Sequence, residues 1–302
     1  MIIQRAAHLG MCFGVRDAIT LATRTARTQP LTILGQLVHN ETVVGRLRAA
    51  GIHIAAGPAD IPTRTVMITA HGTADRTRAE LQARGLEVLE ATCPLVHLAH
   101  GAVQRLVQDG YHPVIVGQRN HVEVRGLTGD LDAFDVVLSE ADVDQVATRD
   151  RFGVVAQTTQ PIERVRHLAQ ALRQRFPGAE VKLVDTVCRP TKDRQAAAVE
   201  LAETSEVVVV IGGVASNNTR ELVATCARHC ARVHHVQGPD DLQPDWFHPE
   251  DRVGLTAGTS TPDATIDAVE ARLREIAVVE HFPFAEQAPM TAGRSALALP
   301  LA

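Results

Sequence analysis

The chain has 302 residues, 45% hydrophobic and 22% charged, and its formal net charge at pH 7 is −5. This length exceeds the range in which one hydrophobic core keeps growing, so we expect two or three domains. The acidic balance argues against a nucleic-acid or anionic-membrane surface and every apolar run is too short to cross a membrane, so we predict a cytoplasmic protein.

The N-terminal region begins the pattern that organises the whole chain. Residues 1–13 contain a predicted strand and a loop with Cys12, and a first α/β module follows over residues 14–93. His39 and His71 lie in the loops after the first two strands of this module. Apolar periodicity predicts, in order, a helix over 15–27, a strand over 31–34, a helix from residue 40, a strand over 66–69, a helix over 74–84 and a strand over 87–90.

Two further modules repeat this order of elements. Module 94–188 is predicted to contain a helix over 95–109, a strand over 113–116, a loop with His121 and Glu123, a strand over 152–156, a helix over 161–176 and a strand over 181–184. Module 189–280 is predicted to contain a helix over 192–203, a strand over 207–211, the loop 216–218, a helix to about 229, a strand over 253–256 and a helix over 262–276. Residues 281–302 lack periodicity and are predicted to form a draped or disordered tail.

The alternation of short strands with longer helices indicates the fold class. Short β-branched runs between amphipathic helices are typical of small parallel sheets covered by helices. We therefore predict an α/β fold of three similar small domains with pseudo-threefold symmetry. Ligands bind such sheets beyond the carboxyl ends of the strands. The cysteines, histidines and hydroxyl residues named below all fall at those ends, which predicts a shared central site.

Three cysteines occupy equivalent points of the repeat, each in a loop between a strand and a helix: Cys12, Cys93 and Cys188. An isolated cysteine is most often a buried free thiol, but three at equivalent points favour a common metal centre. Close Cys-x2-Cys spacing, typical of zinc ribbons and ferredoxins, is absent. Three thiolates would hold three irons of a four-iron cluster and leave the fourth open for chemistry. Cys226 and Cys230 fall outside the repeat and are predicted to be packing residues.

Polar residues at the strand ends suggest an anion site. His39, His71 and His121 each follow a strand, and any one of them alone is more typical of a loop or capping histidine. Together they would form a ring of hydrogen-bond donors suited to a diphosphate. The segments that begin at Asn218 and Ser260 are predicted helix N-caps, and the start of a helix also binds anions.

One carboxyl group is placed to face the predicted centre. Glu123 lies two residues after His121, and proximity to a cluster and a polyanion would raise its pKa and make it a proton donor near neutral pH. The alternative is a solvated loop glutamate. Thr158, at an equivalent strand end, could hydrogen-bond a substrate hydroxyl and relay the proton.

These motifs, in this order, resemble the hydroxymethylbutenyl diphosphate reductase family, also called IspH/LytB. The resemblance covers about residues 1–280 and is carried by Gly-Met-Cys-Phe-Gly-Val, Leu-Val-His-Asn, Thr-Ala-His-Gly, Ala-Thr-Cys-Pro-Leu-Val, His-Val-Glu-Val-Arg-Gly, Gln-Thr-Thr, Cys188 with Arg194-Gln195, and Thr-Ala-Gly-Thr-Ser-Thr-Pro-Asp. It implies a trefoil of three α/β domains around one [4Fe-4S] cluster per chain with three cysteine ligands. It also implies reductive dehydroxylation of (E)-4-hydroxy-3-methylbut-2-enyl diphosphate to isopentenyl and dimethylallyl diphosphate.

The resemblance also implies roles for individual residues. Cys12, Cys93 and Cys188 would hold the cluster, and Glu123 with Thr158 would supply the proton. The substrate diphosphate would be held by His39, His71, His121, Ser216, Asn217, Asn218 and Ser260. The expected electron donor is a ferredoxin or flavodoxin-type protein, since the chain has no dinucleotide or P-loop motif.

Two departures from the family pattern leave other functions open. Ser216-Asn217-Asn218 stands where the family has Ser-Ser-Asn, and Arg189-Pro190-Thr191-Lys192 follows the third cysteine in place of an Ala-Thr-Thr-Asn-like stretch. Altered donors could admit a different anion. The alternatives are a paralogue acting on another diphosphate or phosphate ester, a non-catalytic iron-sulfur or diphosphate sensor, and a thiol hydrolase using Cys93.

Overall fold

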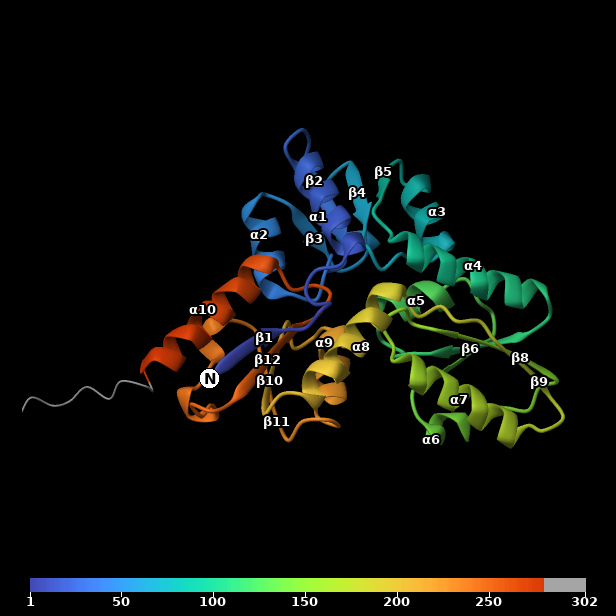
Figure 1. The fold of residues 1–302 in the computed structure, drawn as a ribbon. Helices are drawn as coiled ribbons and strands as arrows, with labels where there is room; N and C mark the ends of the chain where they lie inside the picture. The colour runs from blue at the N-terminus through green and yellow to red at the C-terminus, as the bar shows by residue number, and fades with distance from the viewer. Residues whose placement is uncertain (280–302) are drawn as a thin grey trace, which may run out of the picture.

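Three four-stranded parallel sheets form the framework of the chain in a computed structural model that describes residues 1–279 (Figure 1). Their strand orders are β3-β2-β4-β5, β7-β6-β8-β9 and β11-β10-β12-β1. The predicted α/β trefoil is therefore confirmed. The predicted tail 281–302 lies outside the described residues.

Each unit follows the order of elements expected from the sequence but contains one strand more than predicted: β3 (His53–Ala55), β7 (Asp135–Val137) and β11 (Arg232–Val236). The first unit contains α1 (Phe13–Ala26), β2 (Leu31–Leu34), α2 (Glu41–Ala49), β3 (His53–Ala55), β4 (Thr65–Ile68), α3 (Asp75–Ala83) and β5 (Glu87–Glu90). The second contains α4 (Pro94–Gln108), β6 (His112–Val116), α5 (Val122–Thr128), β7 (Asp135–Val137), α6 (Glu140–Val143), β8 (Arg151–Ala156), α7 (Ile162–Arg175) and β9 (Glu180–Leu183). The third contains α8 (Arg189–Glu203), β10 (Val207–Ile211), α9 (Asn217–Cys226), β11 (Arg232–Val236), β12 (Arg252–Ala257), α10 (Asp263–Val279) and β1 (Ile2–Arg5).

The N-terminal strand β1 completes the third sheet. It pairs in parallel with β12, with Ile2 opposite Arg252, and so takes the edge that β5 and β9 take in the other two sheets. Each of these three strands leads directly into a cysteine loop. The N-terminal strand thus joins the same unit as the C-terminal helix α10. Because β1 occupies the edge equivalent to β5 and β9, the loop of Cys12 is equivalent to the loops of Cys93 and Cys188. The boundaries of the predicted domains remain a prediction.

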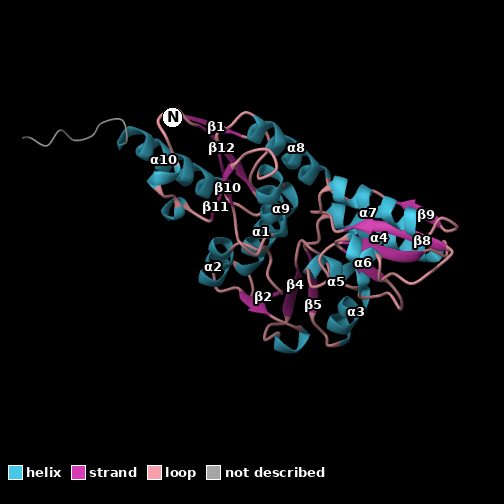
Figure 2. Ribbon diagram, turned by 90° about the horizontal axis from the view of Figure 1, so that it is seen from below, coloured by secondary structure: helices cyan, strands magenta, loops and turns pink. Residues whose placement is uncertain are grey.

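The central strands of each sheet are buried between helices, whereas the edge strands β1, β5 and β9 are partly exposed (Figure 2). Strand β10 consists of five fully buried β-branched residues, as expected for a parallel strand covered on both sides. In the third unit Val209 belongs to one core cluster and Val210 to another, on opposite faces of the sheet. The sheets therefore form rigid platforms, and the loops at their carboxyl ends carry the candidate site.

Three predicted details are corrected by the structure. His121 and Glu123 do not lie in a loop, since His121 is the N-cap of α5 and Glu123 lies in its first turn. Asn217 and Asn218 likewise belong to the first turn of α9, which Ser216 caps. Helix α8 begins at residue 189 instead of 192, because Pro190 suits a first helical turn. Seven-residue α5 was missed because so short a helix has little periodicity.

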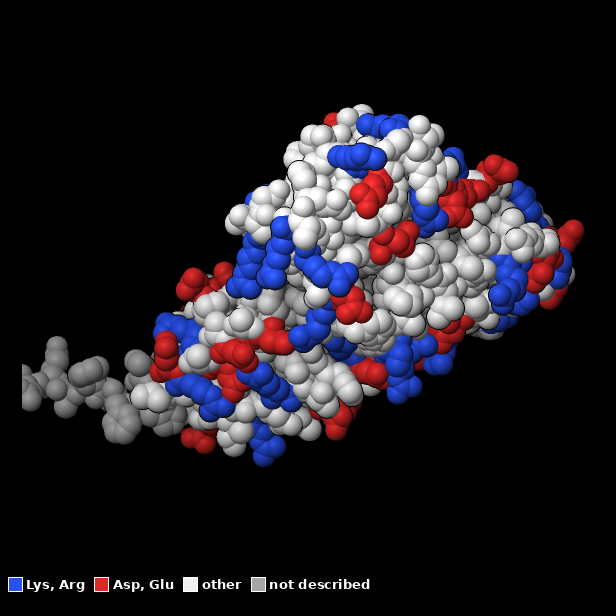
Figure 3. Space-filling view, turned by 90° about the horizontal axis from the view of Figure 1, so that it is seen from above, with Lys and Arg blue, Asp and Glu red and all other residues white. Residues whose placement is uncertain are grey.

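The described surface carries both signs of charge. Figure 3 shows basic and acidic side chains interspersed over the face seen from above, without a broad basic area on that face. None of the helices described within residues 1–279 combines the length and apolar character needed to traverse a bilayer.

Candidate functional site

The three predicted cysteines occupy one structural position in three copies. Each is the N-cap of the first helix of a unit: Cys12 for α1, Cys93 for α4 and Cys188 for α8. Each backbone N–H also donates to a carbonyl in the loop after the third strand of a sheet. These bonds join Cys12 to Thr259 (3.1 Å), Cys93 to Ala70 (3.0 Å) and Cys188 to Thr158 (3.0 Å). The thiol loops are thus clamped to the loops that carry the polar candidates.

Contacts between units bring the cysteine loops together. A Cβ atom at Gly14, in the first turn of α1, would lie 2.6 Å from Sγ of Cys93, so the start of α1 packs directly on the second cysteine. Arg194 of α8 donates from Nε and Nη2 to the carbonyl of Gly10, at 3.0 and 2.6 Å. This buried arginine ties the helix of the third cysteine to the loop of the first. Apart from the family motif, no sequence pattern indicates this role of Arg194.

The surroundings of Cys93 and Cys188 disfavour ionisation of these two thiols in the absence of a metal. Burial raises the pKa of Cys93, and burial also raises the pKa of Cys188 to about 11, only partly offset by a hydrogen bond with Thr191. Burial lowers the pKa of the Arg194 guanidinium, which lies beside Cys12 and Cys188. Thiolates here would therefore need a bound cation, which suits metal ligation.

The three candidate thiols are not gathered closely enough to bind one ion together. All five cysteines are free thiols, and the three candidates are half-buried while Cys226 and Cys230 are buried. Within residues 1–279 the thiols do not form a group tight enough to hold one ion, as a zinc site would require. Thiolates that bind different irons of one cluster can lie further apart. Cys226 and Cys230 pack in a core cluster of the third unit.

The structure brings the three predicted histidines together. The ring centroids of His39, His71 and His121 are 5.3 to 5.5 Å apart, and one nitrogen of each lies within 4.8 Å of the others. His39 precedes the N-cap of α2, His71 follows β4, and His121 caps α5. The rings therefore come from the ends of three strands in two units.

Hydrogen bonding of His121 distinguishes an anion site from a metal site. Its Nδ1 accepts the backbone N–H of Glu123 at 3.2 Å, so the ring proton of the neutral imidazole is on Nε2. Burial lowers the pKa of His121 to about 4, lowers that of His39, and lowers that of His71 well below its ordinary value. A nitrogen that carries a proton donates to an anion and cannot ligate a metal. The triad therefore favours an anionic ligand.

Hydroxyl and amide groups from the third unit complete this cavity. The three imidazoles share a partly open cavity with four side chains of the third unit: Ser216, Asn217, Asn218 and Ser260. Within the described residues, Nδ2 of Asn218, Oγ of Ser260 and Nε2 of His39 are buried without a hydrogen-bond partner. Buried polar groups are rarely left unpaired. The amide of Asn218 and the hydroxyl of Ser260 can each donate a hydrogen bond, so their convergence on one cavity indicates a polar ligand with acceptor oxygens.

The predicted capping roles of Asn218 and Ser260 are wrong. Ser216 caps α9 and accepts the N–H of Thr219 at 3.3 Å, whereas Asn218 accepts the N–H of Thr259 at 2.9 Å through Oδ1. The Ser260 hydroxyl makes no bond within residues 1–279. Both side chains are therefore free to offer a donor to the cavity. The sequence could not show this, because capping and anion binding favour the same residue types.

Asn217, the departure from the family pattern, is turned toward the second unit. Its Nδ2 donates to Oγ1 of Thr159 at 3.1 Å, and its Oδ1 is buried without a partner in the described part of the chain. The same Thr159 hydroxyl accepts from Nε2 of Gln157 at 3.0 Å. The amide thus links the loops of two units.

Glu123 is buried, which rules out the solvated alternative. Its side chain is only 1% exposed, and its carboxyl group accepts the N–H of Thr158 at 2.6 Å and the hydroxyl of Thr158 at 3.1 Å. Burial raises the pKa of Glu123 to about 7, because the loss of hydration outweighs these two bonds. The group is therefore able to hold and release a proton near neutral pH.

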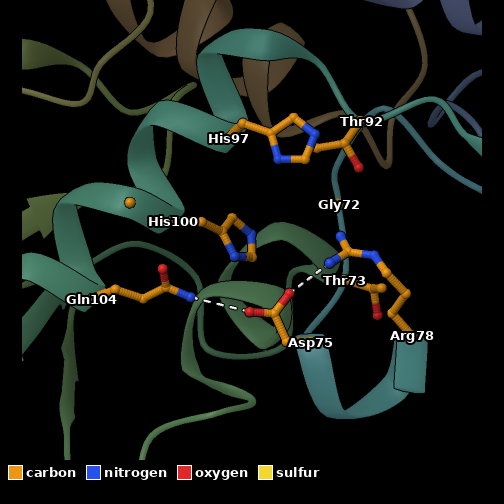
Figure 4. A pocket seen from close by; sticks show the side chains of 9 residues that line it. Gly72, Thr73, Asp75, Arg78, Thr92, His97, His100 and Gln104 are labelled. Atoms are coloured by element: carbon orange, nitrogen blue, oxygen red, sulfur yellow. Dashed lines mark hydrogen bonds and ion pairs between the residues drawn. The ribbon is translucent and has the colours of Figure 1, made fainter. Parts of the chain in front are cut away.

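A second polar pocket borders the site and was not predicted (Figure 4). It lies between α3 and α4, where Asp75 binds Arg78 and Gln104. His100 of α4 contacts the backbone positions of both Gly72 and Gly126, at 3.3 and 3.5 Å from where their Cβ atoms would lie. It thus packs between the loop of His71 and the helix of Glu123. A histidine one turn into an amphipathic helix carries no sequence signal for such a role.

Comparison with known proteins identifies a common family. Residues 3–274 match the family model described as LytB protein. The 4-hydroxy-3-methylbut-2-enyl diphosphate reductase of Geobacter metallireducens is 37% identical over 91% of this chain and 98% of its own length. That of Aquifex aeolicus is 36% identical over 90% of this chain and 95% of its own length.

Solved structures show the same likeness. The E-1-hydroxy-2-methyl-but-2-enyl-4-diphosphate reductase from Plasmodium falciparum superposes with a TM-score of 0.82 at 25% identity, over 88% of this chain and 86% of that one. A structure of (E)-4-hydroxy-3-methyl-but-2-enyl diphosphate reductase, described as the terminal enzyme of the non-mevalonate pathway, gives 0.66 at 34% identity, over 91% of this chain and all of that one. The chain belongs to the LytB protein family.

Proposed function

We propose that this chain reduces (E)-4-hydroxy-3-methylbut-2-enyl diphosphate to isopentenyl and dimethylallyl diphosphate. Two electrons and two protons are consumed: the carbon–oxygen bond breaks, the oxygen leaves as water with one proton, and the other proton adds to carbon. The observation that carries the proposal is the threefold clamp between cysteine loops and polar loops. These bonds hold each thiol loop against a loop at a strand end, which supports a shared centre for the three cysteines and the polar residues.

The family is one of iron-sulfur enzymes, and we propose a [4Fe-4S] cluster held by Cys12, Cys93 and Cys188. When bound, the cluster would supply single electrons to the substrate. The chain's own contribution is to hold the three thiol loops in place through the Arg194 bonds to Gly10 and the backbone clamps.

The anion cavity would bind the diphosphate. The Nε2–H of His121, the hydroxyl of Ser260 and the amide of Asn218 would donate to its oxygens, and the start of α9 adds the favourable end of a helix dipole. The dianionic ligand would also favour protonation of the imidazoles. Ser216, Asn217, His39 and His71 complete the wall of the cavity.

Glu123 would donate the proton that lets the hydroxyl leave as water. With a pKa of about 7 a large fraction of this group is protonated under neutral conditions, unlike an ordinary glutamate. The Thr158 hydroxyl lies 3.1 Å from its carboxyl oxygen and could pass that proton to the substrate.

Anaerobic purification followed by a reduction assay tests the proposal. We expect brown protein with about four irons per chain and conversion of the hydroxymethylbutenyl diphosphate with dithionite and methyl viologen as reductant. Metal-free protein with hydrolytic activity would instead support the thiol hydrolase. Cluster-loaded protein that binds the diphosphate without turnover would support a sensor.

A further inference from the structure

One surface groove reaches from solvent to Cys188, one of the three proposed cluster ligands. It runs between helix α4 and the segment that joins β9 to α8, and Cys188 lies in its wall. Helix α4 itself begins at Cys93, its N-cap. Two of the three proposed ligands therefore belong to the two elements that form this groove.

The proposed reaction, on which this inference rests, requires electrons from outside the chain. The sequence has neither a G-x-G-x-x-G nor a P-loop motif that would bind a nucleotide reductant. Electron-transfer rates fall steeply with distance, so a carrier has to bind where a cluster ligand comes close to the surface. Cys188 is half-buried at the wall of the groove and meets that condition.

We propose that this groove is the docking surface for an acidic protein that carries single electrons. Leu98 of α4 lies in the groove and is 68% exposed, one of few large apolar side chains so exposed among the described residues. The core-facing side of α4 is formed by other residues, including Val96 and Val103. Leu98 is therefore available for contact with a partner.

The charges at the rim of the groove favour a partner with a negative net charge. Arg105 and Arg189 line it from opposite walls, and the Arg189 side chain is 82% exposed although it pairs with Asp193 at 2.6 Å. Lys192 pairs with Asp185 at 2.6 Å beside it. Three basic groups against two acidic ones leave a positive surplus on a chain whose net charge is −5. An acidic carrier would be steered to this surface.

The size of the surface also suits such a partner. A carrier has to leave after each electron, and two electrons are needed for each substrate. Weak electron-transfer complexes bury less area than stable complexes do. A single groove with one exposed leucine and a basic rim fits a transient encounter better than a permanent interface.

Three charge variants on one helix test the proposal. Leu98→Glu and Arg105→Glu add negative charge to the groove. Val107→Glu is the control, because Val107 is also exposed on α4 at 42% but projects from the opposite face of the helix and does not line the groove. The readout is the rate at which reduced flavodoxin, an acidic carrier, bleaches the cluster. Rates are normalised to iron content, which separates docking from loss of the cluster.

We expect bleaching to slow about fivefold or more in both groove variants and to be unchanged in Val107→Glu. Turnover driven by dithionite and methyl viologen should stay the same in all three. Unchanged flavodoxin rates in both groove variants would overturn the proposal. A second outcome would also overturn it: sedimentation shows that Leu98→Glu loses a dimer while the flavodoxin kinetics stay unchanged. The groove would then bind a second copy of the chain. Absence of viologen-driven turnover in the unaltered protein would contradict the proposed function alone, since bleaching needs no substrate.

Discussion

Thr158 and Glu123 are joined by two hydrogen bonds, from the backbone N–H and from the hydroxyl of the threonine to the two carboxyl oxygens. The carbonyl of the same threonine accepts the backbone N–H of Cys188. One residue thus positions both the proposed proton donor and a proposed cluster ligand. The proposed proton donor and the proposed third cluster ligand therefore share one strand end of the second sheet.

Replacement of Glu123 by Gln should abolish proton delivery. The amide keeps the shape of the side chain but has no proton to donate at neutral pH, so we expect turnover to fall about a hundredfold or more with an unchanged cluster spectrum. Glu163→Gln is the matched control, because Glu163 lies in the first turn of α7 but its side chain is 78% exposed. Full activity of Glu123→Gln would remove the residue from its proposed role.

The raised pKa of Glu123 predicts a pH profile. Because burial raises this pKa to about 7, the protonated form dominates below that value and disappears above it. Substrate turnover with a chemical reductant should therefore decline as the pH rises through about 7, and should do so more steeply than in a variant whose turnover is limited by another step. A turnover rate that does not change with pH across neutrality would contradict the assignment of Glu123 as the proton donor.

The raised pKa of Glu123 also predicts how stability depends on pH. Because ionisation of the buried carboxyl group is unfavourable in the folded state, the free energy of unfolding of the apoprotein should fall as the pH rises from the ordinary range of a glutamate toward 7.

Gly14 should be essential for assembly of the cluster site. A methyl group at this position would meet Sγ of Cys93 at 2.6 Å, so Gly14→Ala has to displace the thiol. We expect lower iron content with the fold retained, measured by iron analysis and circular dichroism. Gly45→Ala is the control, since Gly45 lies within α2 with no atom within 4 Å of the new group. That change should stabilise the protein by about 0.5–1 kcal/mol. Equal iron content in the two variants would contradict the close contact between Gly14 and Sγ of Cys93.

The sequence predicts the sheets that carry the site better than it predicts the individual contacts within the site. The sheets were predictable because runs such as Val207–Ile211 alternate regularly with helices, and the cysteines mark equivalent points of that repeat. The histidine ring was predictable because strand ends in parallel sheets converge. The pairing of β1 with β12 joins segments about 250 residues apart and has no local signal.

Contacts that depend on side-chain direction also escaped prediction. The bond of Arg194 to Gly10 crosses between two units, and the position of His100 between two glycines depends on how α4 packs. The sequence predicts that Glu123 faces the proposed centre, but its burial follows from the short helix α5, which the sequence did not indicate. Local pattern predicts which strand ends meet, while packing between units decides which atoms meet there.

Binding of a diphosphate should be accompanied by proton uptake at the histidines. In the free protein burial lowers the pKa of His121 to about 4 and lowers that of His39, so both rings are neutral near pH 7. A bound polyanion favours the imidazolium form and raises these values, so the complex takes up protons and affinity should increase as the pH falls from about 8 to about 6.

Calorimetry of pyrophosphate binding in two buffers of different ionisation enthalpy measures this uptake. His121→Asn should bind more weakly and take up fewer protons than the unaltered protein, and protonation of the ligand itself cancels in that comparison. His167→Asn is the control, because its ring lies at the surface and pairs only with Glu140. Equal uptake in His121→Asn and the unaltered protein would show that the imidazole stays neutral in the complex and acts only as a neutral donor through Nε2.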